Sequence, residues 1–185
     1  MTRPAASATH TRPPRSGGSV ALVLAALGVV LLLVGLFDAI NFTVDDTFIS
    51  MRYAENFAAG KGLVYNVGER IEGYSNLLWT LLLSAFARAG VNQQHDPLAL
   101  LKAAKLMGAL FGIATVLVLV WLVLRLRRDA EWGDHSNLIA LAVVCTSATY
   151  SYPAWCMAGL ETPLCAFLIT LGGALTMVAL RDFHD

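Results

Sequence analysis

Long runs of apolar residues divide this chain into candidate membrane-spanning segments. The four longest runs cover about residues 19–40, 98–125, 136–153 and 163–180. Each reaches or comes close to the ~20 residues that an α-helix needs to cross the hydrocarbon core of a bilayer. A fifth run, residues 74–90, is shorter and ends in Arg88. The pattern predicts an all-α integral membrane protein of about four transmembrane helices, in which 74–90 is a juxtamembrane or re-entrant helix.

Charges beside the runs favour four crossings over five. Arg3, Arg12 and Arg15 precede the first run, so the positive-inside rule places the N-terminus in the cytoplasm. Four crossings also place Arg125-Leu126-Arg127-Arg128 in the cytoplasm, whereas five would place this cluster outside. With four crossings Arg88, Lys102 and Lys105 would lie on or near the outer side, so under the same rule they count against four crossings.

The same reading gives the domain organisation and the location. Residues 1–18 are rich in Pro, Ser, Thr, Ala and Arg, which is typical of a disordered cytoplasmic tail. Residues 19–185 form one transmembrane module, with residues 41–97 as an outer loop that carries juxtamembrane helices. We expect a multi-pass protein of the plasma (inner) membrane with this loop on the outer face.

Composition supports a membrane protein and excludes one class of partner. Hydrophobic residues make up 57% of the chain and charged residues 14%, where a soluble domain would have about a quarter charged. The net charge is zero and no long basic tract is present, so membrane lipid, not nucleic acid, is the expected partner. Cys145, Cys156 and Cys165 lie in or beside apolar runs without metal-ligand spacing, which predicts buried structural thiols.

The first outer loop opens with two adjacent carboxylates, Asp45 and Asp46, just after the first apolar run. Mutual repulsion suits such a pair to proton transfer or to holding a cation. Either acid can also cap a helix over about residues 47–58. An ordinary solvated loop with helix-capping acids is therefore the alternative account. On that helix Arg52 should stack on the acidic side.

The rest of this loop has a less regular pattern. Ile49, Tyr53 and Phe57 recur every four residues, which predicts an apolar stripe against the membrane surface. Residues 63–71 resemble a tight turn between two short extended pieces. Residues 72–76 then lead into the juxtamembrane helix.

A second acidic loop precedes the last run. Four crossings bring Gly159-Leu160-Glu161-Thr162-Pro163 to the same side as Asp45. Thr162 can cap the last helix and Pro163 suits its first turn, which leaves Glu161 beside the helix N-terminus. The number of crossings therefore decides whether the two loops can form one acidic site.

Three strings carry a resemblance to a known family: D-D-T-F-I-S-M-R-Y-A-E-N-F-A-A-G-K-G-L-V-Y-N, G-E-R-I-E-G-Y-S-N-L-L-W-T and G-L-E-T-P-L. In this order and spacing they resemble the GT-C glycosyltransferases, and the nearest likeness is to the terminal arabinofuranosyltransferases of arabinan-containing cell walls. The resemblance covers about residues 20–181. Since such enzymes have eight or more spans, it implies that this chain is their N-terminal part and is inactive alone.

The resemblance also implies an activity. The donor would be a polyprenyl-phosphate sugar, with arabinofuranose as a candidate, and no nucleotide would be bound. The acceptor would be a cell-envelope glycan. In this family an acidic residue of the first outer loop is the catalytic base, and amphipathic juxtamembrane helices lie in the same loop.

Roles follow for the residues of the two loops. Asp45 is the candidate base. Asp46 would orient the acceptor or hold a divalent cation, Mg²⁺ or Mn²⁺, and Glu161 would be a second metal or acceptor ligand. Arg52 would stabilise charge on the departing phosphate. Surface ion pairing and helix capping are the alternative roles of Arg52 and Glu161.

Other residues of the loop have weaker assignments. Glu72 and Asn76 are candidate sugar contacts. Tyr53, Tyr74 and Trp79 are better explained as anchors at the membrane interface than as sugar platforms.

Two other functions compete with an enzyme. A transporter would place ionisable residues within its spans, but here they cluster at the ends of the apolar runs and in loops. A non-catalytic or split-enzyme membrane assembly subunit would explain the short chain, and it remains open from the sequence.

Overall fold

The computed structural model describes residues 17–69, 71–91, 96–127 and 133–184. Within these ranges the secondary structure is helical, without strands. The helices are α1 (Gly17–Asp38), α2 (Asp46–Ala58), α3 (Leu77–Arg88), α4 (Ala99–Leu126), α5 (Gly133–Ala148), α6 (Ser151–Met157) and α7 (Thr162–His184). Residues 1–16 of the predicted disordered tail lie outside the described residues, and residues 17 and 18 already belong to α1.

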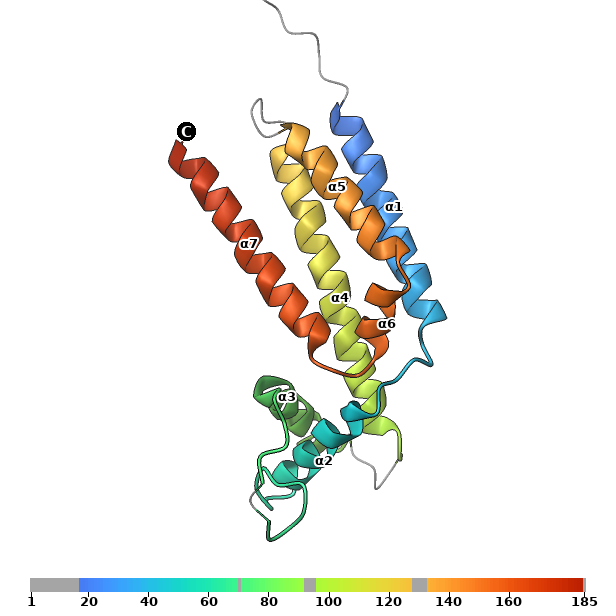
Figure 1. Cartoon of the computed structure of the whole chain (residues 1–185), viewed down its shortest axis with the longest axis vertical. Helices are drawn as coiled ribbons and strands as arrows, with labels where there is room; N and C mark the ends of the chain where they lie inside the picture. The colour runs from blue at the N-terminus through green and yellow to red at the C-terminus, as the bar shows by residue number, and fades with distance from the viewer. Residues whose placement is uncertain (1–16, 70, 92–95, 128–132, 185) are drawn as a thin grey trace, which may run out of the picture.

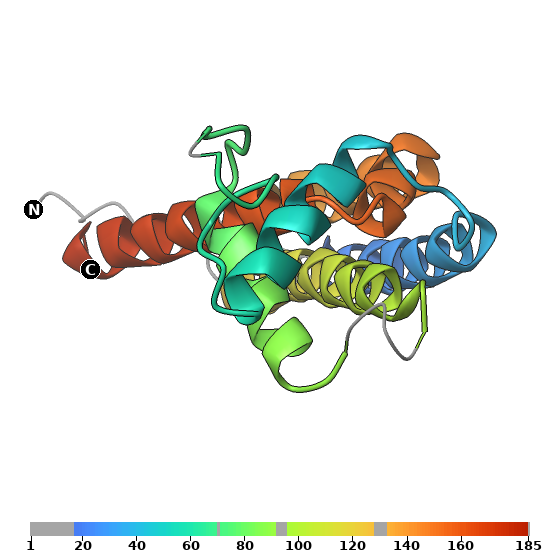
Figure 2. The same ribbon diagram turned by 90° about the horizontal axis from the view of Figure 1, so that it is seen from below.

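The long helices lie side by side, and the two short helices α2 and α3 lie at one end of them (Figure 1). We call this the loop end; the start of α1 and the C-terminal end of α7 lie at the other end. Seen from below, α2 and α3 cross the loop end (Figure 2). Helix α4 runs through the middle and contacts every other helix of the described chain. The run 74–90 thus folds back at the loop end, as predicted, in place of a fifth parallel helix.

Three helices are long and apolar enough to cross a membrane: residues 19–38 of α1, all of α4, and residues 162–183 of α7. A fourth candidate is the pair α5 and α6, which is bent by 66°. The predicted span over 136–153 therefore corresponds to this bent pair and not to one continuous helix. Pro153 explains the bend, because its ring clashes with the carbonyl four residues earlier in a continuous helix, and that residue, Thr149, lies in the break.

The bend lets α6 approach α4 closely at two glycines. A Cβ atom at Gly108 would collide with the backbone oxygen of Cys156, and one at Gly112 would collide with the Sγ atom of Cys156. Small residues at helix crossings allow such close backbone approach. The close packing at these crossings holds α6, and so the chain that leaves it, near the loop end of α4.

The buried face of α2 differs from the predicted apolar stripe. Thr47, Ser50, Met51 and Ala54 are the inward positions, while Ile49 is exposed. This spacing of three and four residues is the usual one for a helix face that packs on other helices. Met51 and Ala54 join a core with residues of α3 and α4. The helix thus packs on α3 and α4 through a face other than the predicted stripe.

The aromatic residues of this region are also buried more deeply than predicted. Trp79 is fully buried in the core between α2, α3 and α4, and Tyr53 is 2% exposed. Fully burying one large apolar side chain contributes about 1.5–3 kcal/mol. These two residues hold the loop end together, so their prediction as interface anchors is wrong.

Basic residues at the loop end have local partners. Lys105 Nζ donates hydrogen bonds of 2.8 Å to the carbonyl oxygens of both Ile40 and Phe42, just beyond the C-terminus of α1. Lys102 Nζ lies 2.6 Å from Asp96 Oδ2. Two of the three cations that opposed the four-span count, Lys102 and Lys105, are thus held by acceptors at the end of the bundle.

Two smaller predictions have different outcomes. Of the three cysteines only Cys156 is buried, whereas Cys145 and Cys165 are exposed, so the prediction of buried thiols is wrong for two of them. The predicted turn is present within residues 63–69, with a 3.2 Å hydrogen bond from Glu69 N to Asn66 O.

Candidate functional site

An open cleft of about 260 Å³ lies at the loop end, where three segments of the chain meet. Its lining residues are Asp46, Ile49, Ser50, Gly73, Tyr74, Ser75, Asn76, Leu160 and Glu161. We call it the acid cleft. It unites three of the predicted site residues, Asp46, Asn76 and Glu161, from the first turn of α2, the start of α3 and the loop before α7.

Asn76 connects these segments through its side-chain amide. Its Nδ2 atom donates to Glu161 Oε2 at 2.7 Å and to Ser50 Oγ at 2.9 Å. Its Oδ1 atom accepts hydrogen bonds from Ser50 Oγ at 3.2 Å and Thr80 Oγ1 at 3.0 Å. With both donors and its acceptor in use, the amide fixes the orientation of the Glu161 carboxylate at the cleft wall.

Contacts with α2 and α3 hold the second acidic loop in place. Thr47 Oγ1 donates to Ala158 O at 2.8 Å, and Trp79 Nε1 donates to Gly159 O at 3.0 Å. Gly159 has a φ of +89°, and a Cβ atom there would lie 2.6 Å from Thr47 Cγ2. Only glycine adopts this backbone without strain in so little space. Glu161 therefore reaches the cleft because the preceding residues dock on α2 and α3.

The position of Glu161 corrects the predicted cap of α7. The helix begins at Thr162, with Pro163 in its first turn as predicted. Glu161, not Thr162, occupies the capping position, and its carbonyl oxygen accepts a 3.0 Å hydrogen bond from Cys165 N. A carboxylate beside a helix N-terminus is favoured by the helix dipole.

The two adjacent acids of the first loop are separated by the fold. Asp46, the first residue of α2, lines the acid cleft, whereas Asp45 does not. Asp45 occupies the N-cap position, but its side chain makes no capping hydrogen bond. Both are exposed, and the described structure shows no hydrogen bond or ion pair from the side chain of Asp46. Asp46 is thus the free carboxylate of the cleft.

Two other predicted site residues lie elsewhere. Arg52 is exposed, and its Nε atom donates to Tyr65 O at 3.3 Å instead of stacking on the acids. Glu72 lines a separate depression of about 380 Å³ that also includes Lys61. The structure therefore does not bring Arg52 or Glu72 to the acid cleft.

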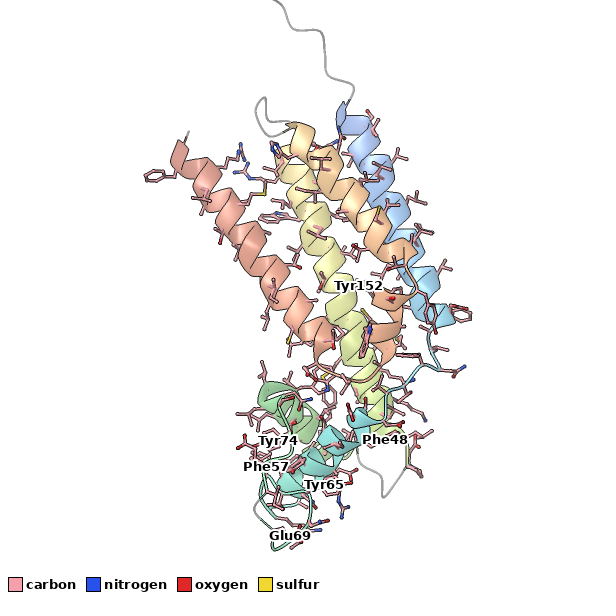
Figure 3. All side chains as sticks on the ribbon, in the orientation of Figure 1. Phe48, Phe57, Tyr65, Glu69, Tyr74 and Tyr152 are labelled. Carbon is pink, nitrogen blue, oxygen red and sulfur yellow. The ribbon has the colours of Figure 1, made fainter. Side chains whose placement is uncertain are left out.

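A second cleft, of about 330 Å³, adjoins the first and shares Ile49 and Gly73 with it. Its other lining residues are Tyr53, Tyr65, Asn66, Glu69 and Ile71. We call it the tyrosine cleft. In Figure 3 the labelled Tyr65, Tyr74 and Glu69 lie together at the loop end, far from Tyr152 in the helical bundle.

The predicted metal role of Asp46 and Glu161 lacks further ligands. Within the described ranges no group of three or more His, Cys, Asp or Glu side chains is placed to hold an ion. Mg²⁺ prefers six oxygen ligands, and the amide oxygen of Asn76 already accepts two hydrogen bonds. These residues do not make a metal site by themselves, so we derive no chemical step through a metal.

The cleft residues that sequence reasoning missed have only weak local signals. Ser50 follows Asp46 by four residues and so lies on the same helix face. Tyr74 and Ser75 immediately precede Asn76, but nothing local shows that they face Glu161. Only the docking of the second loop brings these groups together.

No protein-family model, curated protein or solved structure matches this chain. The function is therefore inferred from the residues of the two clefts and from the apolar character of the long helices.

Proposed function

We propose that this chain carries the acceptor-activating site of a membrane glycosyltransferase whose donor is a polyprenyl-phosphate sugar. The observation that carries the proposal is the acid cleft: a free carboxylate and an oriented one, from two distant loops, meet at the end of long apolar helices. A lipid-linked donor would reach such a cleft from the bilayer, whereas a nucleotide sugar would come from water.

In this proposal α1, α4, the bent pair α5–α6 and α7 cross the membrane, and the loop end faces outward. Arg125 and Arg127 lie near the end of α4 opposite the loop end, on the same side as the start of α1, which favours a cytoplasmic location for that side. Ionisable residues of the long helices lie near their ends, as with Lys102 and Asp182. This supports an enzyme with an interfacial site over a transporter with a charged pathway.

Asp46 is the proton acceptor in this proposal. A hydroxyl oxygen of the acceptor bonds to the anomeric carbon of the donor sugar while the bond from that carbon to the phosphate oxygen breaks. The hydroxyl proton passes to the Asp46 carboxylate, and the polyprenyl phosphate leaves with the electron pair of the broken bond. General-base help of this kind typically contributes 10²–10⁴-fold to a rate, an order-of-magnitude figure.

Glu161 would orient the acceptor. Its Oε2 atom is held by Asn76, which leaves Oε1 to accept a hydrogen bond from a neighbouring acceptor hydroxyl. Two hydrogen bonds from the acceptor to fixed carboxylates would restrict its orientation, which is a major source of rate enhancement in two-substrate reactions.

The charge of the cleft favours an uncharged acceptor over the phosphate of the donor. Among the described residues that line it, Asp46 and Glu161 are the charged ones, and neither Lys nor Arg is among them. Carboxylates would repel a phosphate group bound in the same cleft. The phosphate would therefore bind outside the acid cleft, and the predicted role of Arg52 at the phosphate has no support from its position.

A donor-class experiment tests this proposal. Membranes containing the protein, expressed from its complete reading frame, are supplied with radiolabelled polyprenyl-phosphate arabinose or with a nucleotide sugar. We expect label to enter glycan from the lipid-linked donor alone, and to fall at least about 100-fold in Asp46→Asn membranes. Incorporation from the nucleotide sugar, or equal incorporation in membranes without the protein, would contradict the proposal.

A further inference from the structure

The tyrosine cleft combines an aromatic wall with polar groups at its rim. The rings of Tyr53 and Tyr65 lie 5.8 Å apart, and those of Tyr53 and Tyr74 lie 4.9 Å apart in an edge-to-face arrangement. Tyr53 is buried, while Tyr65 is 43% exposed and offers its ring to a ligand. The rim is formed by Asn66 and Glu69.

The aromatic wall is held rigid from behind. The hydroxyl group of Tyr53 donates to Ile71 O and accepts from Gly73 N, both at 2.9 Å. Asn56 Nδ2 donates to Val64 O at 2.8 Å and to Tyr65 O at 2.9 Å, which fixes the backbone that carries Tyr65. A preorganised wall of this kind lowers the entropic cost of binding.

The rim chemistry favours a neutral polyhydroxy ligand. Asn66 Nδ2 donates to Glu69 Oε2 at 3.0 Å, which leaves Asn66 Oδ1 and Glu69 Oε1 as neighbouring acceptors for hydroxyl groups. Among the described residues of the lining Glu69 is the charged one, and its carboxylate disfavours an anionic ligand. A sugar ring has apolar C–H faces for an aromatic ring and hydroxyl groups at its edge, and the volume of about 330 Å³ is within the range of small-ligand sites.

We propose that the tyrosine cleft binds a neutral sugar residue of the acceptor glycan, packed on Tyr65 and hydrogen-bonded to Asn66 and Glu69. The two clefts share Ile49 and Gly73, so a sugar held here would place the adjoining residue of the glycan beside Asp46. This inference rests on the proposed function for the direction of the glycan. The binding of a neutral sugar can be tested without any transfer reaction.

Saturation-transfer difference NMR on the protein in phospholipid nanodiscs measures this binding directly. Maltoside detergents are avoided because their headgroups are themselves neutral sugars. The probes are a methyl pentofuranoside, maltose and, as an anionic comparison, glucose 1-phosphate. We expect one or both neutral probes to receive saturation from the protein and glucose 1-phosphate to receive none.

Variants then locate the site. In Tyr65→Ala we expect the dissociation constant for the neutral probe to rise about tenfold, equivalent to about 1.4 kcal/mol. Tyr65→Phe, which keeps the ring, and Val67→Ala, which changes an exposed side chain outside the cleft, should stay within about twofold. Glu69→Ala removes a rim acceptor from an exposed position without disturbing the tyrosines, and should weaken binding about threefold to tenfold.

The inference is overturned if neither neutral probe binds, if glucose 1-phosphate binds as well as they do, or if Tyr65→Ala and Glu69→Ala both bind like the wild type. Asp46→Asn separates this result from the proposed function, since it should keep sugar binding. Sugar binding without transfer from the lipid-linked donor would contradict the proposed function alone. Transfer without sugar binding would contradict this inference alone.

Discussion

Asn76 Nδ2 donates a 2.7 Å hydrogen bond to Glu161 Oε2, across 85 residues of sequence. This bond joins the start of α3 to the loop before α7 and forms one wall of the acid cleft. Both residues are half-buried, so the bond is partly shielded from water. A hydrogen bond to a charged group contributes about 1.5–3 kcal/mol.

Substituting Asn76 should therefore destabilise the loop end, and the substitutions should differ in a defined order. Asn76→Ala loses the donor, whereas Asn76→Asp also places a second carboxylate against Glu161. We expect Asn76→Asp to unfold at a lower temperature than Asn76→Ala at pH 7, and both to unfold below wild type. Thermal unfolding in nanodiscs, followed by tryptophan fluorescence, measures this. If Asn76→Asp were as stable as wild type, the contact with Glu161 would be wrong.

Gly159→Ala should disturb the docking of the second acidic loop. The substitution forces alanine to a φ of +89° and puts its Cβ atom 2.6 Å from Thr47 Cγ2. We expect a loss of stability of about 1–3 kcal/mol, typical of a strained backbone position. Gly173→Ala is the matched control, since a Cβ atom at that helical glycine meets nothing within 4 Å.

The double variant Thr47→Ser with Gly159→Ala separates the two causes. Serine keeps a hydroxyl for Ala158 O but lacks the Cγ2 methyl group, so the 2.6 Å collision disappears, while the 3.1 Å approach to the hydroxyl oxygen and the backbone strain remain. Partial recovery of the unfolding temperature is the expected result. A Gly159→Ala protein as stable as the Gly173→Ala control would contradict this description of the loop.

Asp96 gives a prediction about pH. The hydrogen bond from Lys102, and then that from Leu98 N, lower the pKa of Asp96 below its ordinary value of 3.8. A lowered folded-state pKa adds stability that is fully present above about pH 4 and is lost as the pH falls through the lowered pKa. In Lys102→Gln the pKa of Asp96 should rise toward 3.8. A carboxyl ¹³C titration of the labelled protein checks this, and an unchanged midpoint would exclude the ion pair.

Much of the helical framework was predictable because it depends on local composition. The bounds of α1, α4 and α7 follow runs that are almost wholly apolar, and the helix at residues 46–58 ends before the glycines at 60 and 62. The return of residues 74–90 at the loop end followed from a run too short to cross. These features can be predicted without knowing which segments of the chain contact one another.

Features that depend on distant contacts were not predictable. Thr47 meets Ala158 across 111 residues, and with Met51 and Ala54 it belongs to the buried face of α2, in place of Ile49 and Phe57. Arg52 was expected beside the acids by helical spacing alone, but its side chain turns to Tyr65 O. The break before Pro153 has local signals, namely the proline itself and the polar residues at positions 146, 147 and 149 before it.

The sidedness of the loop end can be measured by cysteine labelling. With Cys145 and Cys165 replaced by serine, Lys61→Cys should react with a membrane-impermeant maleimide in intact cells. Asp182→Cys, at the opposite end of the long helices, should react only after permeabilisation. Labelling of both positions from outside would contradict the four-span arrangement that we propose.

The most direct test of the proposed site is the transfer rate of the complete enzyme with single acids replaced. Asp46→Asn keeps the shape of the side chain and removes the proton acceptor, so transfer from the polyprenyl-phosphate sugar should fall about 10²–10⁴-fold at unchanged protein level. Asp38→Asn removes an exposed acid at the end of α1, outside the cleft, and should stay within about twofold of wild type. Asp45→Asn should lose less than about tenfold, because Asp45 does not line the cleft. A large loss in Asp45→Asn with near-normal transfer in Asp46→Asn would contradict the account.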